Sequence, residues 1–467
     1  MTIEEPDAGP APLAPPRARS FLGHPIGLPV IAFTEAFERF SFYGMQALLT
    51  LYMAKTLLLS PHVERIAGFG WFSQALTWIY GAPPATEALA SHIFGTYAAL
   101  VYLTPILGGI VADRWLGKTR TITIGAVLMA IGHFLMAFDQ SFLLALLLLI
   151  LGVGGLKGNL ASQVGALYPP GDGRATDGYQ LYYMGISGGA FLGATICGAL
   201  GEKIAWHWGF GAAGIGMLIG LVIYRKGRRH LPPEPRRART AARETPAPKL
   251  TARDWKILLL LGFLIPVLAL SALGNQQMFN AYLLWADRAY DFTLFGFRLP
   301  TTFLVSFDAI TGFLLMGGTV LFWRWFARRW REPDQMSKLI IGCLISSSAF
   351  ILVAITATQH AATGVKPALW IALLINILNN IGFANVFPVS LALYSRLAPP
   401  AIAGTVIGIY YLFLFIAGIL VGIVGGWLGL MPPAQFWGIH VAAILSAAAI
   451  FLVVKLLFGR MLLREPA

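Results

Sequence analysis

Long, almost wholly apolar stretches recur along this chain, and they constrain its fold more than any other feature. Each is about 20 residues long, the length that an α-helix needs to cross roughly 30 Å of hydrocarbon. The composition agrees, because 57% of the 467 residues are hydrophobic and only 12% are charged, against about 25% in ordinary soluble domains. The stretches are continuously apolar rather than alternating, which argues against spanning strands. The sequence therefore predicts an all-α polytopic membrane protein.

Twelve spanning helices are predicted, six on each side of a polar segment. The first six cover residues 27–56, 89–112, 119–138, 142–167, 178–201 and 208–225. The last six cover residues 255–285, 302–325, 337–358, 367–397, 402–429 and 435–458. The segment between them, KGRRHLPPEPRRARTAARETPAPKLT, is rich in Arg and Pro and is expected to be extended and solvated.

Two six-helix halves joined by a polar linker is the layout of major facilitator transporters. We therefore expect that fold, two six-helix bundles with alternating access between them. The expected division is a tail at 1–24, a bundle at 25–226, the linker at 227–252, a second bundle at 253–460 and a tail at 461–467.

The net charge of the chain is +13, but the basic residues that produce it lie in the loops between predicted spans. This distribution argues against a nucleic-acid-binding surface. Basic residues gather in alternate loops: Arg114, Lys118 and Arg120; the stretch 225–253; Arg324, Arg328, Arg329 and Arg331; and Lys455, Arg460 and Arg464. Under the positive-inside rule this pattern places both termini in the cytoplasm. We expect a bacterial inner membrane protein without a signal peptide. Cys197 and Cys343 are expected to be small packing residues without a disulfide.

The stretch TEAFERFSFYG places charges inside the first predicted span. Glu35, Glu38 and Arg39 lie at i, i+3 and i+4, on one helical face that Tyr43 and Gln46 extend. Each such charge costs about 2.5–3.5 kcal/mol at the bilayer centre on insertion scales. A structural ion pair would need only one of the two glutamates. The second glutamate indicates a site whose protonation can be switched.

Two further stretches in the first half carry polar residues among glycines. In LGVGGLKGNLASQVGALY, Lys157 lies mid-span and needs an anion, either a carboxylate of another helix or a substrate group. The alternative, snorkelling to the surface, is disfavoured because residues 142–156 are all apolar or glycine. In YQLYYMGISGGAFLG, tyrosines beside small residues can line a pocket, although helix packing gives the same string. GGIVADRWLGKTR, residues 108–120, indicates close helix approach and resembles a loop motif of major facilitators in general.

Together these strings resemble the proton-dependent oligopeptide transporter family. FLGHPIGL, TEAFERFSFYG, GVGGLKGN and LYYMGISGG carry the resemblance in the first half, and LTARDWKILLL, MSKLIIG and FPVSLALYSRLAP carry a weaker one in the second. The resemblance implies uptake of di- and tripeptides driven by a proton gradient. It assigns the proton to Glu35 and Glu38, with Arg39. It assigns substrate contacts to Arg39, Tyr43, Tyr97, Lys157 and Tyr183, and further candidates are Gln276, Trp285, Asp308 and Asn385.

Several positions depart from that family's pattern. Gln46 and the amides Asn275 to Gln277 stand where the family usually has an arginine and an acid that pair across the outer gate. Losing both charges is self-consistent, and an amide–amide hydrogen bond would replace the ion pair. Phe383 stands where a glutamate usually meets the peptide's amino group, and Asp308 stands where the family usually has asparagine.

Asp308 therefore becomes a candidate for the missing carboxylate. We expect it to supply the negative charge that Lys157 or a substrate ammonium needs; the alternative is a solvated residue near a helix end. With all five groups ionised, Glu35, Glu38, Arg39, Lys157 and Asp308 carry a net charge of −1. Binding one proton would neutralise this cluster, as in a one-proton symporter.

The expected activity is secondary active transport by a monomer, with a small peptide as cargo. The alternative is proton-coupled transport of another small molecule, an amino acid derivative or an organic anion. A membrane enzyme or sensor is disfavoured, because there is no metal-ligand spacing, P-loop or nucleophile motif; no cofactor or metal is expected. Residues 58–88 join the first two spans, and we expect an interfacial amphipathic helix there, with Trp71 and Trp78 at headgroup depth and a functional lid as the alternative.

Overall fold

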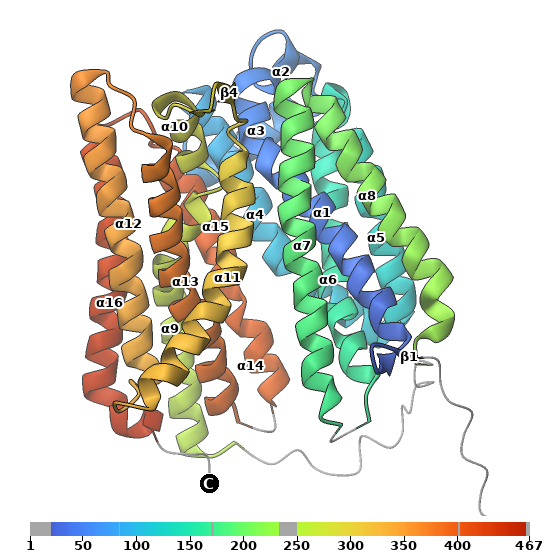
Figure 1. Cartoon of the computed structure of the whole chain (residues 1–467). Helices are drawn as coiled ribbons and strands as arrows, with labels where there is room; N and C mark the ends of the chain where they lie inside the picture. Colours follow the sequence, from blue (N-terminus) through green and yellow to red (C-terminus); the bar gives the residue numbers. More distant parts are fainter. Residues whose placement is uncertain (1–19, 84, 170–171, 233–249, 400–401, 464–467) are drawn as a thin grey trace, which may run out of the picture.

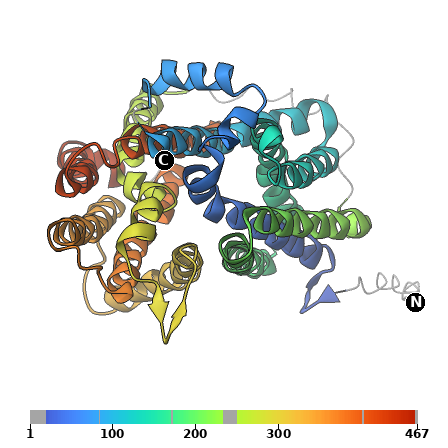
Figure 2. The ribbon, with the colours of Figure 1, turned by 90° about the horizontal axis from the view of Figure 1, so that it is seen from above.

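The computed structural model describes residues 20–83, 85–169, 172–232, 250–399 and 402–463, so most of the predicted polar linker and both predicted tails lie outside the described residues or at their edge. Long helices run side by side through the molecule (Figure 1). Seen from above, the helices before the linker and those after it form two neighbouring groups (Figure 2). The end that carries α10 is called the α10 end here, and the opposite one, which carries β1, is called the β1 end.

The first group holds six long helices. They are α1 (Gly27–Tyr52), α4 (Thr86–Val111), α5 (Lys118–Leu135), α6 (Phe142–Ala166), α7 (Arg174–Lys203) and α8 (Trp206–Gly227). Single π-helical turns, Met53–Leu57 and Ala112–Leu116, extend α1 and α4. Short elements complete this part: the hairpin β1 (Ser20–Phe21) and β2 (His24–Pro25), α2 (His62–Arg65), α3 (Phe69–Tyr80), and 3₁₀ turns at Asp139–Ser141 and Arg228–His230.

The second group is built from α9 (Ala252–Gln277), α10 (Ala281–Ala289), α11 (Phe303–Ala327), α12 (Gln335–Thr363), α13 (Leu369–Leu397), α14 (Ala403–Tyr410), α15 (Leu412–Gly425) and α16 (Pro433–Leu463). A small hairpin, β3 (Thr293–Leu294) and β4 (Phe297–Arg298), joins α10 to α11. A capping box begins α9, in which Thr251 and Asp254 satisfy each other's backbone N–H groups.

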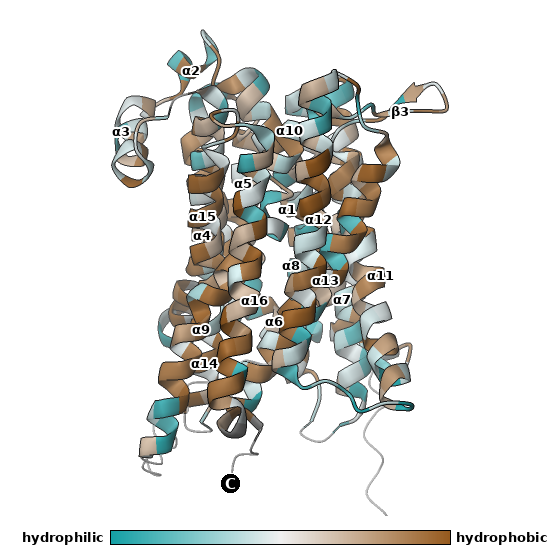
Figure 3. Cartoon of the chain, turned by 90° about the vertical axis from the view of Figure 1, so that its left-hand side faces the viewer, coloured by the Kyte–Doolittle hydropathy of each residue, from teal (hydrophilic) through white to brown (hydrophobic). Residues whose placement is uncertain are grey.

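Ten helices, some joined across short breaks, are long and apolar enough to cross a membrane in the described part of the chain. The two further long helices, α1 and α5, are more polar. Helix α1 contains Glu35, Glu38 and Arg39, and α5 begins with Lys118 and Arg120. Both pack inside the first group, α1 on α7 and α8, and α5 on α6 and α8. Together they make up the twelve predicted spans. The exterior is mostly apolar along the length of the helices (Figure 3).

Two predicted spans contain a local break, although each still forms one candidate span, Ala252–Ala289 and Ala403–Gly425. The span predicted at 255–285 breaks between α9 and α10, where Asn280 has non-helical dihedrals and bonds to Gln277 and to Ser91 of α4. The span predicted at 402–429 breaks at Tyr411, between α14 and α15. The first break depends on a tertiary hydrogen bond to a distant helix, which local hydropathy does not reveal. The helix predicted within 58–88 is present as α3.

Close packing at glycines sets the positions of the helices that carry the predicted site residues. At Gly189 of α7, a Cβ atom would lie 2.0 Å from the backbone oxygen of Ala36 in α1. At Gly108 of α4, it would lie 1.9 Å from the backbone oxygen of Gly154 in α6. Only glycine permits such approach, as in small-residue packing of membrane helices. These contacts bring α7 against the charged turn of α1, and α4 against the turn before Lys157. Cys197 and Cys343 are buried and unbonded.

Replacing Gly189 should therefore push α7 away from α1. We expect Gly189→Ala to cost about 1–3 kcal/mol, the typical penalty for overpacking, and to lower the thermal unfolding midpoint of the purified protein. The neighbouring Gly188 has no atom within 4 Å of its Cβ position, so Gly188→Ala is the matched control and should leave the midpoint nearly unchanged. Equal midpoints for the two variants would contradict this packing.

Candidate functional site

The charged residues of α1 form a compact buried cluster. Arg39 Nε donates a 2.8 Å hydrogen bond to Glu35 Oε1, and Glu38 Oε2 lies 2.9 Å from the same nitrogen. All three residues are buried. Within the described residues, Glu35 Oε2 and both Glu38 oxygens have no hydrogen-bond partner. One arginine thus faces two carboxylates, and three of the four carboxylate oxygens remain unsatisfied. Such a group gains by taking up a proton or a further donor.

Tyrosines surround this cluster. The Tyr182 hydroxyl of α7 lies beside the Glu35 carboxylate. Tyr43 lies one turn beyond Arg39 on α1, and its ring is 6.5 Å from that of Phe279, at the break after α9. Tyr183, which the sequence suggested for the pocket, is 59% exposed on α7 and touches Tyr182 edge-on. The residue that meets the carboxylate is therefore Tyr182, adjacent to the predicted one.

Lys157 approaches the cluster from α6. Its Nζ lies 4.3 Å from the centre of the Tyr102 ring of α4, a cation–π contact. Among the described residues no carboxylate lies within ion-pair distance of it, but Glu38 and Glu35 are near enough to attract it electrostatically. The expected direct carboxylate partner is thus absent, and an aromatic face takes its place. A lysine held this way remains available to an anionic group that enters the site.

Asp308 lies on α11, in the second group of helices. Its Oδ1 accepts a 3.0 Å hydrogen bond from Asn380 Nδ2 of α13, and the same amide lies 3.1 Å from Thr311 Oγ1. No cation pairs with Asp308 in the described part of the chain, so the suggested direct pair with Lys157 is not formed. The carboxylate instead lies near enough to influence Tyr43 electrostatically. Among the described residues, Asp308 is thus a separate negative charge without a partner cation.

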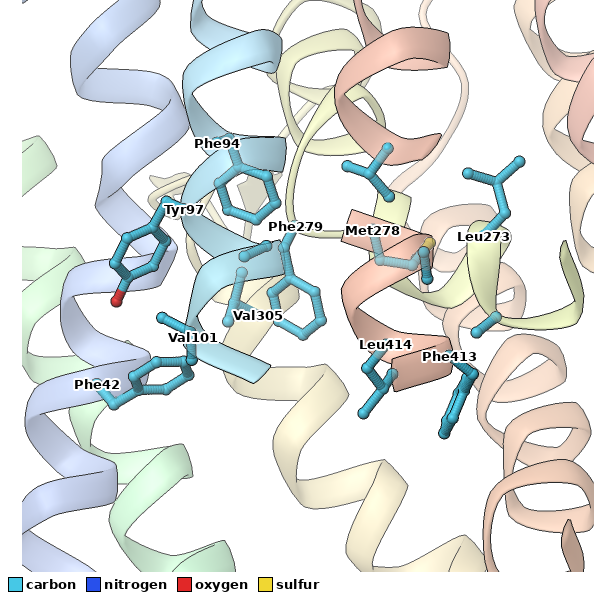
Figure 4. Close-up of a cluster of buried hydrophobic side chains, with 14 of the residues drawn as sticks. Phe42, Phe94, Tyr97, Val101, Leu273, Met278, Phe279, Val305, Phe413 and Leu414 are labelled. Atoms are coloured by element: carbon cyan, nitrogen blue, oxygen red, sulfur yellow. The ribbon is translucent and has the colours of Figure 1, made fainter. Parts of the chain in front are cut away.

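An apolar layer lies at the junction between the two groups of helices (Figure 4). Its residues are Phe42 of α1, Phe94, Tyr97 and Val101 of α4, Leu273 of α9, Met278 and Phe279 at the break after α9, Val305 of α11, and Phe413 and Leu414 of α15. All are buried, and the Tyr97 hydroxyl has no hydrogen-bond partner among the described residues. Such a layer keeps water from passing between the two groups at this level.

Polar contacts join the two groups at the α10 end. Lys55 Nζ lies 2.6 Å from Asp287 Oδ1, and Glu87 pairs with Arg288. The carboxylate of Glu202, in the last turn of α7, accepts hydrogen bonds of 2.9 and 2.7 Å from the backbone N–H groups of Thr301 and Thr302, just before α11. Toward the β1 end, α11 and α14 diverge from α7 and α6 (Figure 1). The structure is therefore closed at the α10 end.

The remaining predicted residues do not join the cluster. Gln46 is buried, its Oε1 has no partner among the described residues, and the predicted amide–amide bond to 275–277 is not formed. Gln276 donates a long 3.4 Å bond to Asn275. Trp285 belongs to an aromatic cluster with Tyr282, Tyr290 and Trp437. The side-chain oxygen of Asn385 accepts a hydrogen bond from Trp323 Nε1, and its nitrogen donates to the backbone oxygen of Ile381.

Sequence reasoning missed three residues of the site. Tyr182 stood in the motif that suggested Tyr183, but adjacent residues of a helix point in different directions and only packing decides between them. Tyr102 and Asn380 carry no local signal, because their partners are 55 and 72 residues away. No group of three metal-ligating side chains occurs in the described ranges. The site can exchange protons, hold an anion at Arg39 and Lys157, and hold a cation at Asp308.

Comparisons with known proteins give one consistent result. A family model described as the POT family matches residues 119–246. The peptide transporter YePEPT of Yersinia enterocolitica is 28% identical, over 94% of this chain and 96% of that protein. A di-/tripeptide transporter of Lactococcus lactis is 28% identical, over 84% and 88%. The crystal structure of a peptide transporter POT in complex with sulfate covers 95% of this chain and 97% of that one, with a TM-score of 0.80 and 25% identity.

The contact between Tyr182 and Glu35 gives a test of the site. We expect Tyr182→Phe to change the pH dependence of the protein's activity, because it removes a hydroxyl that stabilises one protonation state of the carboxylate. Tyr183→Phe is the matched control, since Tyr183 is exposed and makes no hydrogen bond to Glu35, and it should leave the pH profile in place. Initial rates measured between pH 5 and 8 check this. A shifted profile in Tyr183→Phe alone would contradict the assignment.

Proposed function

Because this chain belongs to the POT family of membrane transporters, we propose that it imports di- and tripeptides together with protons. It is a multi-pass membrane transporter and not an enzyme. The observation that carries the proton part is the α1 cluster, in which two buried carboxylates share one arginine and, among the described residues, three of their oxygens accept no hydrogen bond. The names of the relatives from Yersinia and Lactococcus support the cargo.

The cluster links the proton to the cargo through Arg39. When both glutamates are ionised, they hold Arg39 by attraction from two sides. Protonation of one glutamate weakens that hold and leaves the guanidinium available to a second anion. A peptide carboxylate is that anion, and Lys157, which has no ion-pair partner among the described residues and lies over the Tyr102 ring, supplies the second positive charge. Proton and cargo thus favour each other's binding, which is the thermodynamic requirement for coupling.

Asp308 is proposed to hold the amino group of the peptide. It is a carboxylate of the second group whose hydrogen-bond donor is the neutral amide of Asn380, and it lies near enough to Tyr43 of α1 to influence it electrostatically. A zwitterionic peptide would then place its negative end at Arg39 and Lys157 and its positive end at Asp308. This arrangement satisfies the buried charges on both sides. Phe383, which stands on α13 where the family usually has an acid, stacks on Phe387 instead.

The proposed orientation puts the β1 end in the cytoplasm of a bacterium, with the protein in the inner membrane as a monomer. The basic loops support it, because Arg114, Lys118, Arg228 and Arg324 all lie at helix ends on that side. Since the α10 end is closed by contacts between the two groups, we assign this structure to the state that releases cargo to the cytoplasm.

A different cargo of the same general shape is the second candidate. The change of acid from α13 to α11 moves the site for a positive group, and this favours an amino acid derivative or organic anion with a different spacing of charges. Competition by di- and tripeptides against uptake separates the two candidates. If no di- or tripeptide competes, the peptide cargo is excluded and the non-peptide small molecule is retained.

Reconstituted protein should accumulate dialanine in liposomes under an imposed pH gradient. Glu35→Gln should abolish this accumulation, because the site can no longer exchange its proton, while exchange of labelled for unlabelled dialanine continues. Glu64→Gln, an exposed glutamate of α2, is the control and should accumulate normally. Gradient-driven accumulation by Glu35→Gln would show that the proton binds elsewhere.

Asp308→Asn tests the amino-group site. The substitution keeps the size and a hydrogen-bonding oxygen but removes the charge, so the KM for dialanine should rise about tenfold or more, with stability unchanged. N-acetyl-dialanine, which lacks the ammonium, should inhibit both proteins equally. An unaltered KM in Asp308→Asn would return this residue to a structural role.

A further inference from the structure

The helix α3 lies outside the bundle and exposes unusually large apolar side chains. It runs beside the long helices near the α10 end (Figures 2 and 3). Its twelve residues, FGWFSQALTWIY, include no charged side chain, and Trp71 and Trp78 are 78% and 89% exposed. Two exposed tryptophans on an uncharged helix are unfavourable in bulk water but typical of the boundary between headgroups and hydrocarbon.

The side chains of α3 divide into three strips along the helix. The strip toward the bundle consists of Phe72, Leu76 and Tyr80. One exposed flank consists of Gly70, Gln74 and Thr77, and the other of Trp71, Ala75 and Trp78. Residues at i, i+4 and i+7 share a face, so the first flank is suited to water and the second is apolar. A helix that lies at the membrane surface against a protein meets these three surroundings: protein, water and lipid.

The last residue of α3 reaches the junction of the two helix groups. The Tyr80 ring stacks on His92 of α4, with centroids 4.7 Å apart and planes 11° apart, and its hydroxyl lies 3.0 Å from Thr96 Oγ1. The same ring touches α15, where a Cβ atom at Gly422 would lie 2.9 Å from it. Helices α4 and α15 belong to different groups and pack closely there, Gly95 against Gly422. Tyr80 therefore covers this junction.

We propose that α3 binds the lipid headgroup region at the α10 end through Trp71, Ala75 and Trp78, and that Tyr80 thereby braces α4 against α15. Opening of the α10 end separates these two helices, so Tyr80 must leave one of its two partners during each transport cycle. Lipid contact with α3 holds Tyr80 in place and favours the closed state. This role is independent of the identity of the cargo.

Spin labels on the two flanks test the lipid contact in nanodiscs. The label at Trp78→Cys should be relaxed by oxygen, which concentrates in lipid, and shielded from a water-soluble nickel chelate. The label at Gln74→Cys, one turn away on the polar flank, should show the reverse. The unsubstituted chain controls for labelling of Cys197 and Cys343, which are buried. Equal access of the nickel chelate to positions 74 and 78 would overturn the proposal.

Hydrogen–deuterium exchange tests the brace. Tyr80→Ala, and separately the double substitution Trp71→Ser with Trp78→Ser, should speed exchange several-fold at the α10 ends of α4 and α15 in nanodiscs. Gln74→Ser is the control and should exchange like the unsubstituted chain. A double variant that exchanges like the control would show that lipid contact does not hold the junction closed.

Discussion

The pairing of one arginine with two glutamates inside α1 is the interaction on which the rest of the structure depends. Isolated charges at this depth would oppose insertion of the helix by several kcal/mol each. Placed at i, i+3 and i+4, they partly neutralise one another within a single turn. The surrounding helices then complete the site, because Gly189 allows α7 to bring Tyr182 to Glu35 and α6 supplies Lys157.

The cluster can respond to protons because the hydrogen bonding of its carboxylates is incomplete. A fully paired buried network would be rigid and indifferent to protons. Here, among the described residues, three carboxylate oxygens accept no hydrogen bond and Lys157 lies over an aromatic ring. A proton on a carboxylate and an anion near Lys157 would each reduce the number of unpaired groups. In the second group of helices, the Asp308 carboxylate accepts a hydrogen bond from the neutral amide of Asn380. A positive group would complete the pairing of that charge. We propose that a ligand that carries both charges draws the two groups together.

Two kinds of contact close the α10 end: apolar packing at its centre and charged pairs at its rim. The centre consists of the apolar layer that includes Phe42, Tyr97 and Phe279, and beside it the neutral bond between Ser91 and Asn280. The charges lie nearer the helix ends, where Lys55 meets Asp287 and Glu202 caps the start of α11. Amides at Gln46 and at 275–277 fit this division, because no central ion pair has to be broken during opening.

Most of the architecture followed from the length and apolarity of the spans, and the charged cluster followed from helical spacing. The breaks at Asn280 and Tyr411 did not, because Tyr411 lies in an apolar run and the bond that Asn280 makes is to Ser91, 189 residues away. Tyr182 could not be separated from Tyr183 without knowing how α7 packs on α1. Asn380 could not be identified either, because its bond to Asp308 joins residues 72 positions apart in the sequence. Contacts between distant helices therefore account for what the sequence left open.

The ratio of protons to cargo tests the central claim most directly. It can be obtained from the membrane potential at which net dialanine flux through the reconstituted protein reverses, at fixed gradients of protons and peptide. A cluster with a net charge of −1 that is neutralised on loading predicts one proton for each dialanine. A reversal potential independent of the proton gradient would contradict it, because the buried glutamates would then carry no proton across the membrane.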